Sequence, residues 1–237
     1  MKTAHAAVFF AMKLTYYGHA CFGVEVCGHH LLFDPFVTPN PKAAEIELGK
    51  IPADFILISH GHFDHIADAV EVAKRTGATV VANWEVCDWL AKQGVEKTHP
   101  MNIGGGYNFP FGRVKMTNAV HSSSLPDGTY GGNAGGFLVE TREGNFFYSG
   151  DTALTHSMKL IGESASLKFA VLCIGDNFTM GPEDAARAAD FIEARDVVGV
   201  HYDTFPQIEI DHHDAIREFT DRDATLHLLE IGSSKTF

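Results

Sequence analysis

Short segments rich in apolar, aromatic and β-branched residues open the chain. Residues 13–18, 21–26 and 30–33 fit this description and are separated by glycine and histidine, which predicts an antiparallel meander of strands. After a connection that contains several prolines, residues 55–59 read Phe-Ile-Leu-Ile-Ser, a nearly continuous apolar run that is typical of a strand buried on both faces. The first part of the chain is therefore predicted to be sheet.

Strands and helices alternate after this run. Apolar residues recur with helical spacing from residue 66 to residue 73 and predict an amphipathic helix that ends before Gly77. A second strand and helix are predicted at residues 79–82 and 84–92. Later helices are predicted to begin at Pro182 and near Asp214, and further strands at residues 114–120, 137–141, 145–148, 169–174, 197–200 and 226–231. This order predicts an α/β protein with a four-layer αββα sandwich, in which two mixed sheets face each other and helices cover both outer faces.

Composition and charge narrow the class of protein. The 237 residues are 45% hydrophobic and 20% charged, which is typical of a globular chain, and we expect a single domain at residues 12–237 after an N-terminal extension at residues 1–11. The formal net charge of -12 disfavours nucleic acid and anionic membranes as partners. No stretch is long and apolar enough to span a bilayer. The four cysteines form no paired motif, so we expect reduced thiols and a cytoplasmic location, and a homo-oligomer stays open.

Four potential metal ligands lie within six residues, directly after the predicted strand at residues 55–59. The segment reads His60-Gly61-His62-Phe63-Asp64-His65. Imidazole nitrogens and carboxylate oxygens bind zinc, manganese and iron. Three buried imidazoles and a carboxylate are difficult to satisfy by hydrogen bonds alone, because a neutral imidazole offers one donor and one acceptor. Metal binding is therefore the interpretation we favour over a polar loop that caps a helix.

Three more potential ligands follow predicted strands, namely His121, Asp151 and His201. Any one of them alone would be typical of an ordinary loop residue, because loops collect polar groups. Together they repeat one position, directly after a strand. If these strands end at the same rim of the sandwich, five histidines and two aspartates converge there, which is enough for two metal ions.

The chain resembles the metallo-β-lactamase superfamily, whose H-x-H-x-D-H signature is matched by the segment from residue 60 to residue 65. The later ligands also occur in the order that this family shows, and the resemblance extends over most of the chain from Met12 onward. It implies a shared set of ligands for two metals, which are His60, His62 and His121 for the first, Asp64, His65 and His201 for the second, and Asp151 as the bridge.

Three other segments support a narrower resemblance. Residues 18–22, 33–36 and 201–206 are similar to the uncharacterised bacterial and archaeal metal-dependent hydrolases that are related to ascorbate-6-phosphate lactonase. One position departs from that pattern. Gly175-Asp176 stands where the resemblance leads us to expect Gly-Gly before the segment Asn-Phe-Thr-Met-Gly-Pro, and we expect this difference to alter the wall of the pocket.

Three residues outside the signature are candidates for supporting roles. Asp34 is predicted to accept an N–H from a ligand imidazole, although a turn aspartate before Pro35 explains it equally well. His19 is a candidate substrate contact or proton donor, with a hydrogen-bonded structural histidine as the alternative. Asn177 is a candidate substrate contact because it precedes the helix predicted at Pro182, whose free backbone N–H groups would hold an anion, and ordinary capping is the alternative.

These features predict a binuclear metal-dependent hydrolase. A hydroxide held by two divalent ions, zinc or manganese, would cleave an ester, lactone, amide or phosphoester bond in a small-molecule substrate, neutral or anionic, with Asp64 and His201 as catalytic residues. Three alternatives stay open: a nuclease, which the acidic charge disfavours, a thioester hydrolase resembling glyoxalase II, and a metal-binding sensor or scaffold without turnover. Catalysis is favoured over the last, because a structural zinc site usually closes with four protein ligands and three ligands per ion leave room for water.

Overall fold

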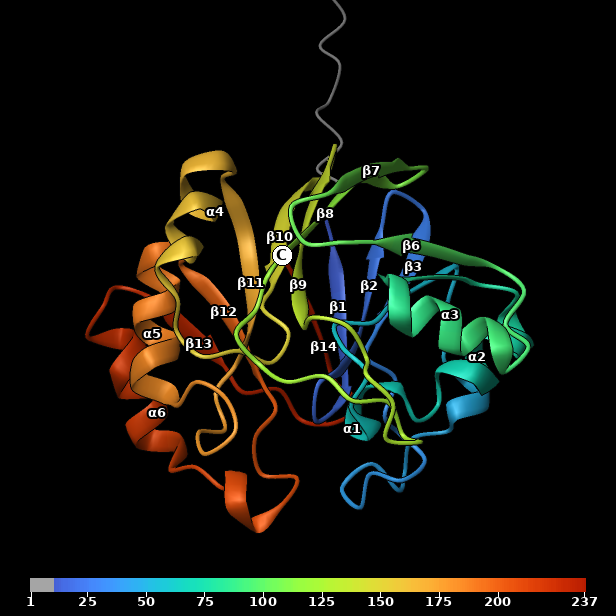
Figure 1. Cartoon of the computed structure of the whole chain (residues 1–237). Helices are drawn as coiled ribbons and strands as arrows, with labels where there is room; N and C mark the ends of the chain where they lie inside the picture. Colours follow the sequence, from blue (N-terminus) through green and yellow to red (C-terminus); the bar gives the residue numbers. More distant parts are fainter. Residues whose placement is uncertain (1–10) are drawn as a thin grey trace, which may run out of the picture.

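Two seven-stranded mixed sheets face each other at the centre of the molecule, and helices cover the outer face of each sheet (Figure 1). The computed structural model describes residues 11–237, so the extension predicted at residues 1–11 lies almost wholly outside the described residues. The predicted four-layer αββα sandwich is confirmed. Within residues 11–237, no helix has the length and apolar character needed to cross a membrane.

The first sheet joins an antiparallel meander to a set of parallel strands. In spatial order its strands are β14 (Ser234–Thr236), β1 (Lys13–Gly18), β2 (Cys21–Val26), β3 (His29–Phe33), β4 (Phe55–Leu57), β5 (Thr79–Asn83) and β6 (Thr98–Met101). The pairs from β14 to β3 are antiparallel, as predicted for the meander, and the pairs from β3 to β6 are parallel. The last strand of the chain therefore closes the edge beside the first.

The second sheet has the same mixed character. In spatial order its strands are β13 (Thr225–His227), β12 (Asp196–Val200), β11 (Leu167–Cys173), β10 (Gly144–Tyr148), β9 (Gly135–Thr141), β8 (Gly112–Asn118) and β7 (Gly106–Phe109). The pairs from β13 to β10 are parallel, and the pairs from β10 to β7 are antiparallel. Both sheets thus carry several strands that run in one direction.

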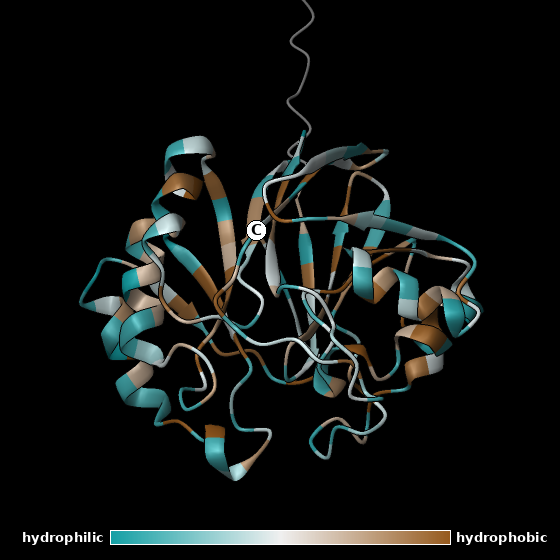
Figure 2. Cartoon of the chain, viewed as in Figure 1, coloured by the Kyte–Doolittle hydropathy of each residue, from teal (hydrophilic) through white to brown (hydrophobic). Residues whose placement is uncertain are grey.

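In the described part of the chain, six α-helices form the two outer layers. The helices on the side of the first sheet are α1 (Phe63–Ile66), α2 (Ala69–Thr76) and α3 (Trp84–Lys92), and those on the side of the second are α4 (Lys159–Ser164), α5 (Pro182–Phe191) and α6 (His212–Thr220) (Figure 1). Among residues 11–237, three single 3-10 turns lie in the connections, at η1 (Leu48–Lys50), η2 (His156–Met158) and η3 (Pro206–Ile208). Figure 2 shows hydrophilic and hydrophobic stretches alternating along the helices, as expected when one helix face is buried.

Apolar side chains fill three layers, one between the sheets and one between each sheet and its helices. The apolar run that begins in β4 contributes side chains to two of these layers. Leu57 belongs to the cluster between the sheets, whereas Ile56 and Ile58 pack with the helix side of the first sheet. Successive strand side chains point to opposite faces, so a continuous apolar run is what a strand covered on both sides requires.

Some element boundaries differ from the predictions. The helix predicted from residue 66 is two helices, because Asp68 leaves helical geometry and its carboxylate accepts the backbone N–H groups of Val37, at 2.6 Å, and Thr38, at 2.9 Å. The strand predicted at 226–231 ends at His227. β14 and α4 were not predicted, since neither short segment has a strong hydrophobic period.

Candidate metal centre

The candidate ligands follow strands that point the same way. In the first sheet, β2 lies antiparallel between β1 and β3, and β4 is parallel to β3. In the second sheet, β9 lies antiparallel between β8 and β10, and β12 is parallel to β11 and β10. Residues that follow the carboxyl ends of these strands therefore gather at one rim of the sandwich, and they are His19, Asp34, Ser59, His121, Asp151 and His201.

The signature segment follows β4 in a sharp loop that leads into α1. His62 is the N-cap residue of this short helix, so Asp64 and His65 lie in its first turn. Gly61 permits the loop to pass close to a neighbouring segment, because a Cβ added there would lie 3.0 Å from a methyl carbon of Leu125. The short loop thus presents four side chains toward one point.

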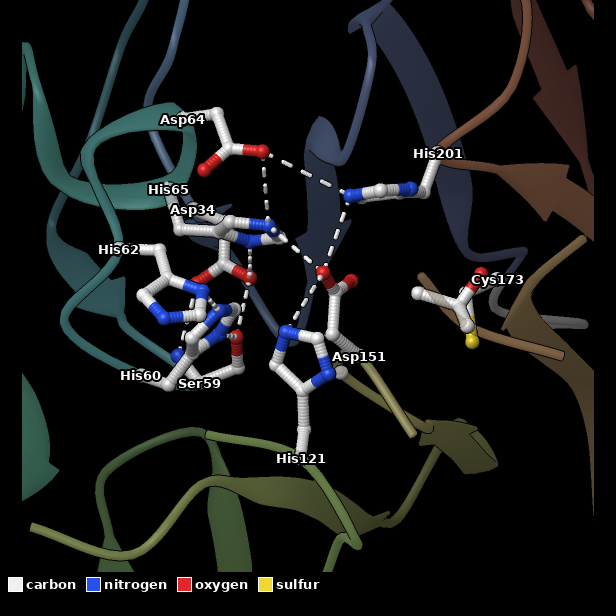
Figure 3. A network of polar contacts seen from close by, with 12 residues as sticks. Asp34, Ser59, His60, His62, Asp64, His65, His121, Asp151, Cys173 and His201 are labelled. Atoms are coloured by element: carbon white, nitrogen blue, oxygen red, sulfur yellow. Dashed lines mark hydrogen bonds and ion pairs between the residues drawn. The ribbon is translucent and has the colours of Figure 1, made fainter. Parts of the chain in front are cut away.

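The seven predicted ligands lie together, as Figure 3 shows. Within residues 11–237, three groups of potential ligand atoms have all their members within 4.8 Å of one another: His60, His62 and His121; His60, His65 and Asp151; and His19, Asp64, His65 and His201. The first group is the ligand set predicted for the first metal. The third contains the set predicted for the second metal together with His19.

Asp151 lies between the two sets. Its Oδ2 atom is 3.0 Å from Nε2 of His201, 3.2 Å from Nε2 of His65 and 3.6 Å from Nε2 of His121 (Figure 3). The aspartate is 2% exposed, which makes an unpartnered negative charge at this point costly. Oδ2 of Asp151 is therefore within 3.6 Å of one imidazole of the first set and two imidazoles of the second.

Burial and neighbouring charges act in opposite directions on the titratable groups. Burial lowers the pKa of His60 well below its usual value, and nearby imidazoles add to this effect. Burial also opposes protonation of His201 and His65, but the adjacent Asp151 carboxylate outweighs it, raising the pKa of His201 to about 9 and that of His65 well above its usual value. Burial raises the pKa of Asp151, yet His201 and His65 hold it well below the usual range. The Asp151 carboxylate thus favours the protonated forms of His65 and His201 when no metal ion is bound.

The residues present fit a divalent metal ion. Nε2 of His65 and Oδ1 of Asp151 are buried and have no hydrogen-bond partner among the described residues. Buried polar atoms are rarely left unpaired in folded proteins, so such atoms mark a place where a ligand or ion is needed. Imidazole nitrogen and carboxylate oxygen are donors that zinc, manganese and iron accept, and no thiolate lies among the three groups.

Asp34 contacts a candidate ligand, as predicted, and it also joins the two sheets beneath the centre. Its Oδ1 accepts the backbone N–H of Ser59 at 2.7 Å. Its Oδ2 accepts from the Ser59 hydroxyl at 2.6 Å, from Nδ1 of His65 at 2.8 Å and from the Tyr148 hydroxyl at 2.6 Å. Tyr148 ends β10 of the second sheet, whereas Asp34 follows β3 of the first.

This network fixes the tautomers of two candidate ligands. A carboxylate only accepts hydrogen bonds, so the Ser59 hydroxyl donates to Asp34 and its lone pairs are left to accept from Nδ1 of His60, which is 2.9 Å away. Nδ1 of His65 donates to Asp34 in the same way. In the neutral form that metal binding requires, each of these imidazoles has its proton on Nδ1 and its lone pair on Nε2. Nε2 of His60 then accepts from Nδ1 of His62, which is 2.9 Å away.

His19 is buried at 1% exposure and both of its ring nitrogens have protein partners. Nε2 lies 3.0 Å from Oδ2 of Asp64, and Nδ1 lies 2.9 Å from the Thr204 hydroxyl. Burial and the neighbouring His201 lower the pKa of His19 to about 4, so the neutral ring donates its Nε2–H to Asp64. The contacts are those of the structural alternative, and a direct substrate contact stays a prediction.

Asn177 lies at the rim, in an exposed turn with φ of 50°. Its neighbour Phe178 lines a cavity of about 300 Å³ that also contains five of the candidate ligands, whereas Asn177 itself does not line it. Asp176 adopts φ of 60°, a conformation that a glycine would adopt without strain. Substrate binding by Asn177 stays a prediction.

Sequence reasoning missed Ser59, Tyr148 and Thr204, which support the candidate ligands through hydrogen bonds. Tyr148 and Thr204 are 114 and 185 residues away from their respective partners, so no local spacing connects them. Ser59 stands directly before the signature and offered the one usable signal, a hydroxyl beside a candidate ligand.

Comparison with known families agrees with this geometry. Residues 29–202 match the model of the Beta-lactamase superfamily domain. A UPF0173 metal-dependent hydrolase of Flavobacterium johnsoniae is 51% identical over 223 residues, which cover 94% of this chain and 99% of the relative. The chain belongs to this family of metal-dependent hydrolases. A UPF0173 metal-dependent hydrolase of Methylacidiphilum infernorum is also 51% identical, with the same coverage of both chains.

Solved structures give the same picture. Igni18, a metallo hydrolase from the hyperthermophilic archaeon Ignicoccus hospitalis, matches with a TM-score of 0.87 and 34% identity over 96% of this chain and 99% of that one. An isothiocyanate hydrolase from Delia radicum gut bacteria matches with a TM-score of 0.75 at 16% identity, over 95% of this chain and 99% of that one. The second likeness shows the fold alone.

Proposed function

We propose that this metal-dependent hydrolase is binuclear and cleaves an ester, lactone, amide or phosphoester bond in a small molecule of the cytoplasm. The observation that carries the proposal is the position of Asp151, whose buried carboxylate lies between the two groups of imidazoles. Its Oδ1, which has no hydrogen-bond partner among the described residues, and Nε2 of His65, which contacts Oδ2 of the same aspartate at 3.2 Å, would be donors for a second ion.

Two divalent cations, zinc or manganese, would supply Lewis-acid polarisation of the scissile bond and lower the pKa of the attacking water toward about 7. His60, His62 and His121 would hold one cation, and Asp64, His65 and His201 the other, with Asp151 shared. These assignments leave fewer than four terminal side chains for each ion, which is the arrangement of a catalytic site rather than of a closed structural site.

Other residues of the chain orient the candidate metal ligands. Asp34 and Ser59 keep the lone pairs of His60 and His65 directed at the centre, and His19 holds one oxygen of Asp64. Because a ligand imidazole that is fixed by a second hydrogen bond binds metal more tightly, this shell prepares the site before any ion arrives.

A hydrolysis panel tests the proposal. The metal-stripped protein and its zinc- and manganese-loaded forms are assayed on an ester, a lactone, an amide and a phosphodiester. We expect turnover that requires metal, and a loss of about 100-fold or more in Asp151→Asn. Asp88→Asn, an exposed carboxylate on α3 that pairs with Lys92, is the matched control and should retain parental rates. Absence of turnover in all metal-loaded forms on all four substrates would refute the proposal.

A further inference from the structure

The cavity beside the candidate ligands has two aromatic walls. In addition to five candidate ligands, its lining consists of Phe178, Phe205 and Ser122. Phe178 comes from the loop after β11 and Phe205 from the loop after β12, so the two rings flank the carboxyl ends of neighbouring strands. At about 300 Å³ the cavity holds a small molecule.

Phe178 is 56% exposed, but the turn that carries it is held in place by backbone hydrogen bonds. The turn that carries it is closed by a hydrogen bond of 3.0 Å from the backbone N–H of Asp176 to the carbonyl of Met180. Met180 is buried and donates its own N–H to the carbonyl of Thr152 at 2.9 Å. Since Thr152 directly follows Asp151, these hydrogen bonds fix the backbone that carries Phe178 relative to the centre.

Phe205 is supported from behind by other rings. Its centroid lies 6.5 Å from that of Phe36 and 5.6 Å from that of His19. Phe36 is 2% exposed and also contacts His19, with centroids 5.4 Å apart. The second wall is thus the exposed face of a packed aromatic cluster.

Apart from the candidate ligands, this cavity has no side chain within residues 11–237 that would pair with an anionic group. Among the described residues that line it there is no lysine and no arginine, and the carboxylate of Asp64, which is 28% exposed, faces it. Lys42 lines a second cavity that shares no lining residue with the first, and there it is accompanied by Asp203 and Glu230. Beyond the candidate ligands, an anionic substituent of the substrate would lie against two aromatic rings, with no lysine or arginine of the described lining to pair its charge, within a chain of net charge -12.

We infer that the substrate is uncharged beside the scissile bond and carries an aromatic or alkyl group that packs against Phe178 and Phe205. The inference rests on the proposed hydrolase function and selects among the substrates that it allows. Apolar substrates lose water-exposed surface against the two rings, which is favourable in proportion to the area removed from water. The Ser122 hydroxyl is left to contact one polar atom of the substrate.

Two esters with the same leaving group test the inference. 4-Nitrophenyl butyrate and 4-nitrophenyl hemisuccinate have acyl chains of equal length that end in a methyl group or a carboxylate. After subtraction of the enzyme-free rate, we expect kcat/KM of the zinc-loaded protein to favour the butyrate by at least about 10-fold. Phe178→Ala should reduce this ratio, and Phe178→Lys should reduce it further or invert it. Leu160→Ala removes an exposed apolar side chain on α4 and should leave the ratio unchanged.

A binding measurement keeps the inference separate from the proposed function. Hexanohydroxamic acid and adipic acid monohydroxamic acid share a metal-binding group and a six-carbon chain, and they differ only at the far end. Calorimetry with the zinc-loaded protein should show at least about 10-fold tighter binding of the methyl-ended compound, lost in Phe178→Ala. Equal or tighter binding of the carboxylate-ended compound, or faster turnover of the hemisuccinate, would overturn the inference. Absence of turnover with the expected binding preference would instead count against the ester-hydrolysing function alone.

Discussion

Replacement of Asp34 by asparagine tests how the site is prepared for metal. Asp34 is fully buried and accepts four hydrogen bonds, three of them at Oδ2. An asparagine has one accepting oxygen and one donating NH₂ group in nearly the same space. With NH₂ at the Oδ2 position, Nδ1 of His65 has to become an acceptor, which moves the proton to Nε2, the nitrogen that faces the centre. With NH₂ at the Oδ1 position, it meets the backbone N–H of Ser59 instead.

The first orientation requires a change in the tautomer of His65, and the second leaves two donors facing each other. A hydrogen bond to a charged group contributes about 1.5–3 kcal/mol, so we expect Asp34→Asn to lower the free energy of unfolding by about that amount. Loss of a group that orients a ligand imidazole typically costs about 10–100-fold in metal affinity. That range corresponds to about 1.4–2.8 kcal/mol of binding free energy.

Tyr148→Phe is the matched control. It removes one donor to the same oxygen but keeps the carboxylate, so His65 keeps its proton on Nδ1. Both variants are measured by chemical denaturation of the metal-free protein and by competition with a chromogenic zinc chelator. We expect similar losses of stability but a large loss of zinc affinity in Asp34→Asn alone. Zinc affinity of Asp34→Asn equal to that of the parent would refute the tautomer argument.

Three other perturbations have defined expected outcomes. Phe33→Ala removes a buried ring between the sheets that stacks on Phe22, with centroids 4.5 Å apart, and contacts Tyr148. We expect the free energy of unfolding, measured with denaturant, to fall by about 3–5 kcal/mol. A fall below about 1 kcal/mol would contradict the packing described. Chelation of metal should lower the thermal unfolding midpoint, because ions that bind only the folded chain stabilise it; an unchanged midpoint in calorimetry would argue against bound metal. Gly175→Ala should weaken metal binding, because the added Cβ overlaps the carbonyl oxygen of His201. Gly49→Ala is the control, because open space surrounds Gly49, and it should bind metal like the parent. Equal zinc affinities of the two variants would show that His201 is not displaced.

Much of the fold follows from periodicity in the sequence. The bounds of β1, β2 and α3 agree with the predicted ranges, because each has a clear apolar period between glycine or polar breaks. The break between α1 and α2 could not be predicted from the sequence. It depends on hydrogen bonds that Asp68 accepts from backbone N–H groups that lie 31 and 30 residues earlier in the chain. Tertiary contacts of this kind have no local signature.

The candidate site, like the fold, was predictable from the sequence only in part. The grouping of His60, His121, Asp151 and His201 was predictable because each follows a strand, and parallel strands end at the same rim. The hydroxyl groups of Tyr148 and Thr204 were not predictable, since their partners are distant in the sequence. The aromatic walls also escaped the sequence argument, because exposure of Phe178 depends on how its turn is anchored to Thr152.

The number of metal ions per chain tests the central claim most directly. Elemental mass spectrometry is applied to the purified protein, and again after metal is stripped and zinc or manganese is reloaded, with Asp151→Asn beside the parent. The account predicts about two ions per chain in the parent and fewer in the variant. One ion per chain at saturation would contradict a binuclear centre, and no bound ion under any loading condition would contradict the metal site itself.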